Sequence, residues 1–411
     1  MVTRFPCQRT TRGRRARQHP RQLFFGVTYF SLYLLLCWSV IAAITWQLFP
    51  GATALVGAAA VYSAAPIFLF IRRLRWDFYP NALFRVLVIR VLLYTQLTLP
   101  FVTVAALVGA LCGWPFGAAL FTARAFALVT VVGALVLFAI GYVGSRSLVT
   151  RGIEARIPDL PPEFDGFRII QLSDLHVGPQ QSRAFLSRVV RNVTALRADL
   201  IAVTGDLIDD RPEDVDVYAA AFAQLDAPHG VFMIAGNHDV YAGWTEVYSA
   251  LRRLVPGHVL VNESRLVHRG AASIAIVGTG DPAGMQRGVG DEVGPDIPRA
   301  MATVPRNTVS IALAHNPALF PALAQHNVAL TLSGHTHWGQ FAIPQRGWSV
   351  ASRFLQYAMG TYQLDNSLLY ISPGTGYWGI PFRIGALPEI TAVTLRRAAA
   401  GITIGEPKTA L

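Results

Sequence analysis

Cysteine is scarce in this sequence and is missing from its polar C-terminal part. The only cysteines of the 411-residue chain are Cys7, Cys37 and Cys112. The chain beyond Cys112 therefore has no disulfide framework, no thiolate metal site and no cysteine nucleophile. This distribution is typical of a protein in a reducing compartment.

Acidic residues are almost absent from the first 156 residues, which contain 16 arginines but only Asp77 and Glu154. That part carries a net charge of +14, whereas residues 157–411 have 19 basic and 22 acidic residues, a net of −3. The overall charge of +11 thus belongs to the hydrophobic part. The polar part lacks the basic surface of a nucleic-acid-binding protein, and we expect no nucleic-acid partner.

Four apolar runs in the N-terminal part contain no Asp, Glu, Lys or Arg, and each can cross about 30 Å of hydrocarbon. They are Leu23–Phe49, Thr53–Ile71, Val91–Leu111 and Ala125–Val143. Buried core helices are the alternative, but four successive runs of this length favour four transmembrane helices over residues 23–143. A transporter would need ionisable groups inside such spans, so we interpret the spans as an anchor.

Arginines lie on alternate connections between these runs. Seven occur in the tail of residues 1–22, five in the second connection and three in the exit segment, whereas the first connection has none and the third only Arg124. Positive charge marks the cytoplasmic side of a membrane protein. The sequence thus predicts a multi-pass inner-membrane protein in contact with the lipid bilayer. Its N-terminus and its polar part are expected in the cytoplasm.

From about residue 168 the chain alternates short apolar runs with helical patterns. Six runs predict buried strands: Arg168–Leu172, Leu200–Val203, Val231–Ala235, Ile274–Val277, Val309–Ala314 and Val328–Leu332. Four stretches between them predict helices: Ser182–Leu196, Val215–Leu225, Trp244–Leu254 and Pro317–Gln325. This alternation predicts a layered α/β domain, in which sites lie beyond the carboxyl ends of strands.

Five polar motifs follow five of these strands. They are Ser173-Asp174-Leu175-His176, Gly205-Asp206-Leu207-Ile208-Asp209, Gly236-Asn237-His238-Asp239, His315-Asn316-Pro317 and Gly334-His335-Thr336-His337. Imidazoles and carboxylates without thiolates suit Mn²⁺, Fe²⁺ or Zn²⁺. About seven candidate ligands exceed the need of one four-coordinate ion, so the motifs predict two divalent metal ions.

Two of these motifs need a turn of the backbone. In Asp174-x-His176 and in His335-x-His337, alternation along an extended chain would place the two side chains on opposite faces. A twist at the end of a strand would bring both side chains of a pair to one cavity. Asp-x-His, Gly-Asp or a single His is common in turns or cores, whereas Gly-Asn-His-Asp and Gly-His-x-His are rarer. The five motifs together in this order indicate a metal site.

These motifs resemble the calcineurin-like metallophosphoesterase family over about Phe167–Leu395. The resemblance extends to Ala314-His315-Asn316-Pro317 and to Pro388-Glu389-Ile390-Thr391, which are similar to a bacterial branch that often carries N-terminal membrane segments. It implies an α/β fold, a four-layer sandwich of two mixed β-sheets flanked by helices. We expect this domain at residues 167–397, after a linker at 144–166 and before a tail at 398–411.

The resemblance also implies roles for single residues. One metal would be held by Asp174, His176, Asp206 and His337, and the other by Asp206, Asn237, His315 and His335. His238 would stabilise charge on the phosphate or protonate the leaving oxygen. Asp209 would orient His238 through a ring nitrogen, and Asp239 is a further candidate for such support.

Three positions depart from patterns within the wider superfamily. Trp338 stands where many relatives have Gly, so its ring is expected to narrow the cleft or to offer substrate an apolar wall. Asp209 stands where purple acid phosphatases have Tyr, which argues against an iron–tyrosinate centre. Asp210 stands where Ser/Thr protein phosphatases have Arg, which argues against a phosphoprotein substrate.

The resemblance implies hydrolysis of a phosphodiester or diphosphate by a metal-bridging hydroxide. The anchor favours a phosphorylated, lipid-linked substrate, and relatives include hydrolases of acylated sugar nucleotides such as UDP-diacylglucosamine. Asp281–Pro298 and Phe341–Tyr362 are candidate walls of a substrate groove, with core packing as the alternative for the second. Two other functions stay open: a tethered phosphodiesterase for a soluble substrate, and a non-enzymatic metal-binding sensor.

Overall fold

The structure is a computed structural model. It describes residues 31–43, 51, 54, 56–62, 65, 82–178, 181, 183–209, 211–285, 293–399, 401–405 and 408–409. The predicted basic tail of residues 1–22 and Asp210 lie outside these described residues. The chain divides into two compact units, Met1–Gly133 and Ala134–Leu411.

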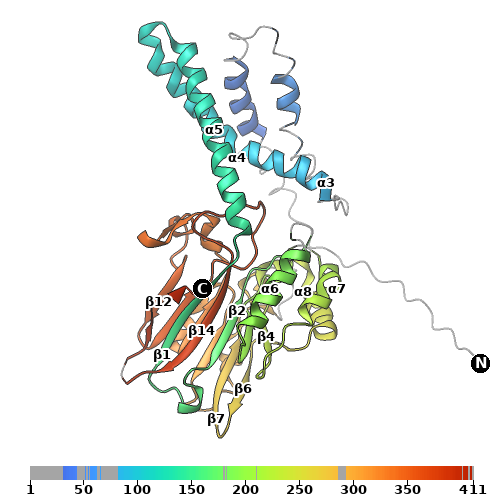
Figure 1. The fold of residues 1–411 in the computed structure, drawn as a ribbon, viewed down its shortest axis with the longest axis vertical. Helices are drawn as coiled ribbons and strands as arrows, with labels where there is room; N and C mark the ends of the chain where they lie inside the picture. Colours follow the sequence, from blue (N-terminus) through green and yellow to red (C-terminus); the bar gives the residue numbers. More distant parts are fainter. Residues whose placement is uncertain are drawn as a thin grey trace, which may run out of the picture. The chain divides into compact units, whose positions relative to one another are not determined.

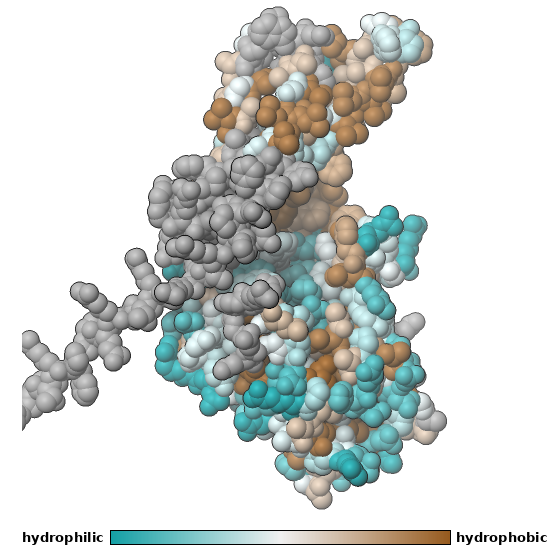
Figure 2. Space-filling model, turned by 180° about the vertical axis from the view of Figure 1, so that it is seen from behind, coloured by the Kyte–Doolittle hydropathy of each residue, from teal (hydrophilic) through white to brown (hydrophobic). Residues whose placement is uncertain are grey.

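Two helices among the described residues are long and apolar enough to cross a membrane, Val86–Phe116 and Ala119–Arg146. The first combines a π-helix, η2 (Arg85–Arg90), with α4 (Val91–Gly113) and η3 (Trp114–Phe116), and the second is α5. Figure 2 shows apolar side chains gathered on the surface of the helices.

The described residues therefore contain two candidate spans, whereas the sequence predicted four. The predicted run Leu23–Phe49 includes a shorter apolar helix, Ser31–Ala43. Parts of this run and of Thr53–Ile71 lie outside the described residues. The third and fourth predicted runs fall within the two long helices.

The second unit contains two mixed sheets (Figure 1). The first has eight strands in the order β15-β1-β14-β2-β3-β4-β5, with β16 beside β1. Its strands are β1 (Val149–Ile157), β2 (Arg168–Leu172), β3 (Leu200–Val203), β4 (Val231–Met233), β5 (His258–Val259), β14 (Glu389–Arg397), β15 (Thr403–Ile404) and β16 (Lys408–Thr409). From β2 to β5 all pairs are parallel, which brings their carboxyl ends to one edge.

The second sheet has six strands in the order β12-β13-β9-β8-β7-β6. Its three central pairs are parallel and its two outer pairs are antiparallel. The strands are β6 (Glu263–Arg269), β7 (Ala272–Gly278), β8 (Ser310–Leu313), β9 (Leu330–Ser333), β12 (Gly360–Leu364) and β13 (Ser367–Ile371). The carboxyl ends of β8 and β9 carry two of the predicted motifs.

Alternating side chains divide the domain into four layers. Ile169 packs between the two sheets with Ile276, whereas the next residue, Ile170, packs against helices on the outer face. On the outer face of the second sheet, Ala275 packs with two short helices. The helices are α6 (Arg183–Ala195), α7 (Glu213–Phe222) and α8 (Asn237–Leu254) on one side and α9 (Ile297–Met301) and α10 (Phe320–Gln325) on the other. The predicted α/β fold with two mixed sheets and flanking helices is confirmed.

The edge of the first sheet differs from the prediction. Strand β1 lies inside the segment 144–166 that we expected to be a linker, and it pairs in parallel with β14 along its whole length. The expected tail at 398–411 includes β15 and β16, both paired with β1. Ile153, Ala155 and Ile157 of β1 are buried, so the strand contributes to the core between the sheets.

Helix α8 begins seven residues before its predicted start at Trp244. Its first turn is stabilised by the Asp239 carboxylate, which accepts a hydrogen bond from the Gly236 N–H at 2.9 Å. The break at Gly243, where φ is +112°, separates this first turn from the amphipathic part that the sequence pattern revealed. The early start places Asn237 and His238 at the helix N-terminus.

Candidate metal centre

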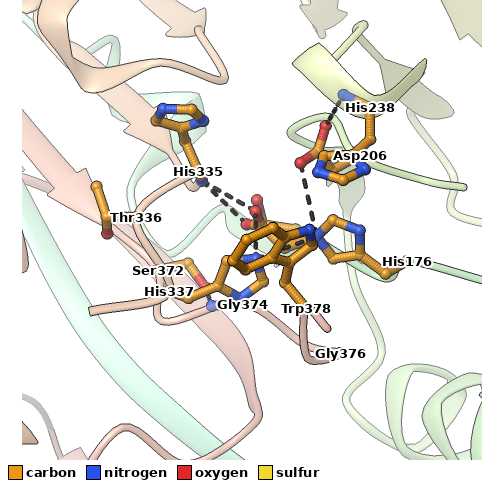
Figure 3. A network of polar contacts seen from close by, with 12 residues as sticks. His176, Asp206, His238, His335, Thr336, His337, Ser372, Gly374, Gly376 and Trp378 are labelled. Atoms are coloured by element: carbon orange, nitrogen blue, oxygen red, sulfur yellow. Dashed lines mark hydrogen bonds and ion pairs between the residues drawn. The ribbon is translucent and has the colours of Figure 1, made fainter. Parts of the chain in front are cut away.

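The five predicted motifs meet at one end of the two sheets. Asp174 and His176 follow β2, and Asp206 follows β3. Asn237 and His238 begin α8 after β4, and the other three predicted histidines follow β8 and β9. Figure 3 shows side chains from both sheets directed toward one another. The topology therefore assembles in space what the sequence spreads over 164 positions between Asp174 and His337.

The backbone is left-handed at five of the seven predicted ligands. The φ angles are 51° at Asp174, 44° at His176, 51° at Asp206, 71° at His335 and 48° at His337. Such angles cost about 1–3 kcal/mol for each residue and persist where the surrounding structure imposes them, often at functional sites. This backbone conformation supplies the turn that was predicted for the Asp174/His176 and His335/His337 pairs. It lets both side chains of each pair point into one cavity.

The first predicted ligand group faces a common point. Nε2 of His176 lies 3.0 Å from Nε2 of His337, which lies 3.4 Å from an Asp174 carboxylate oxygen. An Asp206 carboxylate oxygen lies 3.6 Å from the same His176 nitrogen. These His–carboxylate separations exceed ordinary hydrogen-bond lengths, while the atoms converge as ligands of one cation would.

The second predicted group lies on the other side of Asp206. Nε2 of His315 is 3.3 Å from an Asp206 carboxylate oxygen and 3.2 Å from Oδ1 of Asn237. Nδ1 of His335 is 2.8 Å from the same Asn237 oxygen. Asp206 is thus the residue that both groups share, as a bridging carboxylate would be.

The tautomer of His315 suits metal binding. Its Nδ1 lies 2.8 Å from the main-chain carbonyl of Thr204, which can only accept a hydrogen bond. The proton of the neutral ring therefore sits on Nδ1, and the Nε2 lone pair is free for a metal. The contact at His337 has the opposite direction. Nη2 of Arg383 donates to Nδ1 of His337 at 2.8 Å, which fixes the ring but leaves the proton of the neutral imidazole on Nε2, where a metal would have to displace it.

Charges within the site shift several pKa values. Burial opposes ionisation of Asp206, yet His315 and His176 hold its pKa well below the usual range. Burial and the neighbouring His315 lower the pKa of His335 to about 4. Burial, with the Arg383 guanidinium, also holds the pKa of His337 well below its ordinary value. Burial opposes protonation of His315 and His176, yet the neighbouring carboxylates raise the pKa of both. Asp206, with its low pKa, is ionised, which favours metal binding, whereas a metal would displace a proton from His315 and His176.

The residues present fit a pair of divalent cations. The described residues contain three His/Asp groups whose ligand atoms lie within 4.8 Å of one another: Asp174 with His176 and His337, His176 with Asp206 and His238, and Asp174 with Asp206 and His315. The overlapping groups share residues, which is the geometry expected for two neighbouring ions rather than two separate sites.

Comparison with known proteins assigns the family. Residues 167–339 match the model of the calcineurin-like phosphoesterases. The uncharacterized metallophosphoesterase YkuE of Bacillus subtilis is 31% identical over 241 residues, which cover 58% of this chain and 82% of the relative. The chain belongs to the calcineurin-like metallophosphoesterase family.

Two further metallophosphoesterases are similar to this chain. The uncharacterized metallophosphoesterase Cj0846 of Campylobacter jejuni is 31% identical over 247 residues, covering 60% of this chain and 63% of the relative. The transmembrane protein with metallophosphoesterase domain of Danio rerio is 33% identical over 254 residues, covering 60% and 57%. The chain thus spans about three fifths of the length of these two relatives.

The candidate catalytic pair of this metallophosphoesterase is close together, but the contact differs from the expected one. Nδ1 of His238 lies 2.8 Å from the main-chain carbonyl of Asp209, whereas the Asp209 carboxylate is 3.6 Å away. That carboxylate lies 3.5 Å from Nδ1 of His176. The main chain of Asp209 therefore orients His238, and the side chain faces a predicted ligand.

Trp338, which the sequence predicted to bind substrate, is directed into the interior of this metallophosphoesterase. Its side chain is only 2% exposed, and its indole N–H donates to the carbonyl of Ile371 at 3.0 Å. The ring packs with Phe320 and Leu369 in a separate small core. The left-handed backbone at Trp338, with φ at 51°, accompanies this inward direction.

Sequence reasoning missed two residues beside the site. Arg383 is fully buried and contacts His337, and the ring of Trp378 lies 6.2 Å from the ring of His238. Both belong to a Gly/Pro-containing segment without a recognised motif, so no sequence pattern marked either residue as part of the site. Asp239 was a candidate supporter, and its buried carboxylate accepts hydrogen bonds from Gly236 and Ile208.

Proposed function

We propose that this protein hydrolyses a phosphodiester or diphosphate bond with two divalent metal ions. The observation that carries the proposal is the position of Asp206 between two groups of imidazole and carboxylate ligands, at 3.3 Å from His315 and 3.6 Å from His176. When bound, two such ions supply a hydroxide at neutral pH and withdraw charge from phosphoryl oxygens. Mn²⁺, Fe²⁺ and Zn²⁺ all suit these ligands.

The chain's own residues have distinct roles in this proposal. The ligand carboxylates and imidazoles fix the positions of the ions. His238 stands beside the ligand groups with its Nδ1 directed at the Asp209 carbonyl, which leaves Nε2 for the substrate. In its protonated form this nitrogen donates a hydrogen bond to the phosphoryl group or a proton to the leaving oxygen.

A lipid-linked substrate at the cytoplasmic membrane surface is the substrate class that we favour. Two candidate membrane helices precede the domain, and relatives are named as transmembrane proteins with a metallophosphoesterase domain. The arginine-rich connections favour a cytoplasmic position of the domain. A half-exposed indole, Trp378, stands beside His238 and offers an apolar surface next to the reacting phosphate.

The test of the proposal is hydrolysis of bis(p-nitrophenyl) phosphate by the full chain in detergent, with Mn²⁺, Fe²⁺ or Zn²⁺ added in turn. We expect turnover with at least one metal and none with a chelator. Absence of turnover with every metal, in protein that has bound metal, would contradict a general phosphodiesterase. It would favour the sensor hypothesis if lipid-linked diphosphates were not hydrolysed either.

A further inference from the structure

Helix α5 contains an uncharged stretch that matches the thickness of a bilayer. Its only charged residues are Arg124 and Arg146, which leave residues 125–145 without charge. At 1.5 Å for each residue this stretch is roughly 32 Å long, close to the hydrocarbon thickness of about 30 Å. Gly141 and Tyr142 thus fall in its last turns. The Arg146 guanidinium lies over the Tyr142 ring, 5.1 Å from the ring centre. Aromatic and basic side chains of this kind anchor helices at the membrane–water interface.

A loop of the catalytic domain, residues 376–387, is fixed to these last turns. The main-chain N–H of Arg383 donates to the carbonyl of Gly141 at 2.8 Å. The ring of Phe382 packs edge-on against Phe138, with ring centres 6.0 Å apart. The packing leaves no space for a side chain on the helix, since a Cβ at Gly141 would lie 2.2 Å from the Phe382 ring. The loop therefore sits at the level where α5 becomes charged.

The same loop reaches the metal centre. The Arg383 side chain contacts the predicted ligand His337, and the Trp378 ring lies beside His238. Only four residues lie between Trp378 and Arg383 in the chain. The metal centre is consequently within one loop of the helix end, and the half-exposed Trp378 ring lies beside it.

Exposed apolar side chains lie on this loop and on a segment bonded to it. The loop is joined to a second segment, residues 339–355, by two hydrogen bonds between the Gln340 side chain and the main chain of Trp378, at 3.1 and 3.2 Å. Ala342 in that segment also donates to the carbonyl of Ile384 at 2.9 Å. The loop and the second segment together expose five large apolar residues, which we name the apolar rim: Ile343, Val350, Phe354, Leu355 and Trp378.

We propose that this apolar rim lies in the membrane–water interface at the C-terminal end of α5, so that the metal centre opens among lipid headgroups. Phe354 is 81% exposed and Trp378 54%, a large cost in water for two aromatic rings on one rim. Aromatic side chains are favoured at this depth of a bilayer. A lipid surface fits the rim because the rim's loop is bonded to the last apolar turn of α5.

The position of the rim can be measured without any enzymatic activity. In the full chain, with Cys7, Cys37 and Cys112 replaced by alanine, single cysteines at Phe354 and Trp378 would carry a bimane label in nanodiscs. Lipids with a nitroxide at the headgroup or near the glycerol would quench the label. Matched labels at Val132, within α5, and at Leu266, exposed on β6 of the same domain, provide the two references.

We expect the labels at positions 354 and 378 to be quenched at least twofold more than the label at 266. A label at 132 is expected to be quenched best by lipids with the nitroxide deep in the acyl chain. Rim labels quenched no more than the 266 label, while the 132 label is quenched, would overturn the proposal. An unquenched label at 132 would overturn it as well, because α5 would then not lie in the bilayer.

Discussion

Nη2 of Arg383 lies 2.8 Å from Nδ1 of His337, and the other nitrogen of the same guanidinium donates to the main-chain carbonyls of Pro373 and Ala386. Burial lowers the pKa of Arg383 to about 10, so the side chain stays charged at neutral pH. The buried Arg383 side chain thus contacts a predicted metal ligand and also holds the loop in which Arg383 itself lies. Substitution of Arg383 therefore tests whether this contact with His337 supports metal binding.

Replacement of Arg383 by methionine should weaken metal binding and stability together. We expect a loss of about 10–100-fold in metal affinity, because the His337 ring loses the buried guanidinium that holds it in position. The carbonyls left unpaired should cost about 1–3 kcal/mol of unfolding free energy. Metal titration and denaturant unfolding of the metal-free protein measure the two effects. Arg252→Met on the exposed face of α8 is the control, and equal metal affinity in both variants would contradict a supporting role for Arg383.

Replacement of His238 by alanine should reduce turnover without removing the metals. The His238 side chain is directed at the Asp209 carbonyl. The main-chain N–H of His238 donates a hydrogen bond to the Asp206 carboxylate at 2.8 Å, and the variant keeps this hydrogen bond. General acid catalysis contributes about 10²–10⁴-fold, so a fall of that size in kcat is expected. The comparison is His268→Ala, an exposed histidine on β6. Equal kcat in the two variants would remove His238 from the mechanism.

The strands that form the centre of the first sheet were predictable, but its edge was not. β3 is a continuous apolar run and β2 is apolar except for Arg168 and Gln171, and the bounds of both strands match the prediction. β1 carries Arg151, Glu154 and Arg156, which made the segment resemble a linker. Its stability depends on a partner far along the chain, because Arg151 forms an ion pair with the buried Glu389 at 2.8 Å. A local pattern cannot reveal such a pair.

The same distinction applies to the site. The candidate ligands were found because each lies in a motif at the end of a strand. Arg383 and Trp378 were missed since their positions depend on where residues 376–387 dock. The inward direction of Trp338 was missed because it depends on a left-handed backbone that neighbouring residue types do not specify.

Replacement of Gly334 by alanine should disrupt the centre through a steric clash. A Cβ at this position would lie 1.9 Å from Oγ of Ser173 and 2.2 Å from a carboxylate oxygen of Asp174. We expect the Asp174 side chain to shift and metal affinity to fall at least tenfold, as binding titrations would show. Gly405→Ala, where the nearest atom is 3.5 Å away, should have no effect. Normal affinity in Gly334→Ala would show that the surrounding loop gives way easily.

Glu389 should make the stability of the metal-free protein fall as pH rises. Burial raises the pKa of Glu389 despite the ion pair with Arg151, so the folded chain holds this proton more tightly than the unfolded chain. Its contribution is present below the unfolded pKa of about 4.3 and is lost as pH rises toward the folded pKa. In Glu389→Gln this loss disappears. Unfolding free energies of both proteins from pH 4 upward measure it, with the exposed Glu163→Gln as control.

In that experiment the stability of Glu389→Gln relative to the parent chain should increase with pH. The direction matters more than the absolute difference, because the glutamine also alters the hydrogen bonds that Tyr370 and Thr391 donate to this side chain. A constant difference across the pH range, equal to that of the Glu163 control, would mean that Glu389 titrates alike in the folded and unfolded chains.

The most direct test of the two-metal centre is the number of metal ions bound by the full chain and by its Asp206→Asn variant, measured by elemental analysis alongside phosphodiester turnover. Asp206 is the residue that both ligand groups share. We predict two bound ions for each molecule of the unaltered protein. In the variant we predict at most one bound ion and turnover reduced at least 100-fold. Two tightly bound ions and undiminished turnover in Asp206→Asn would contradict a centre bridged by this carboxylate.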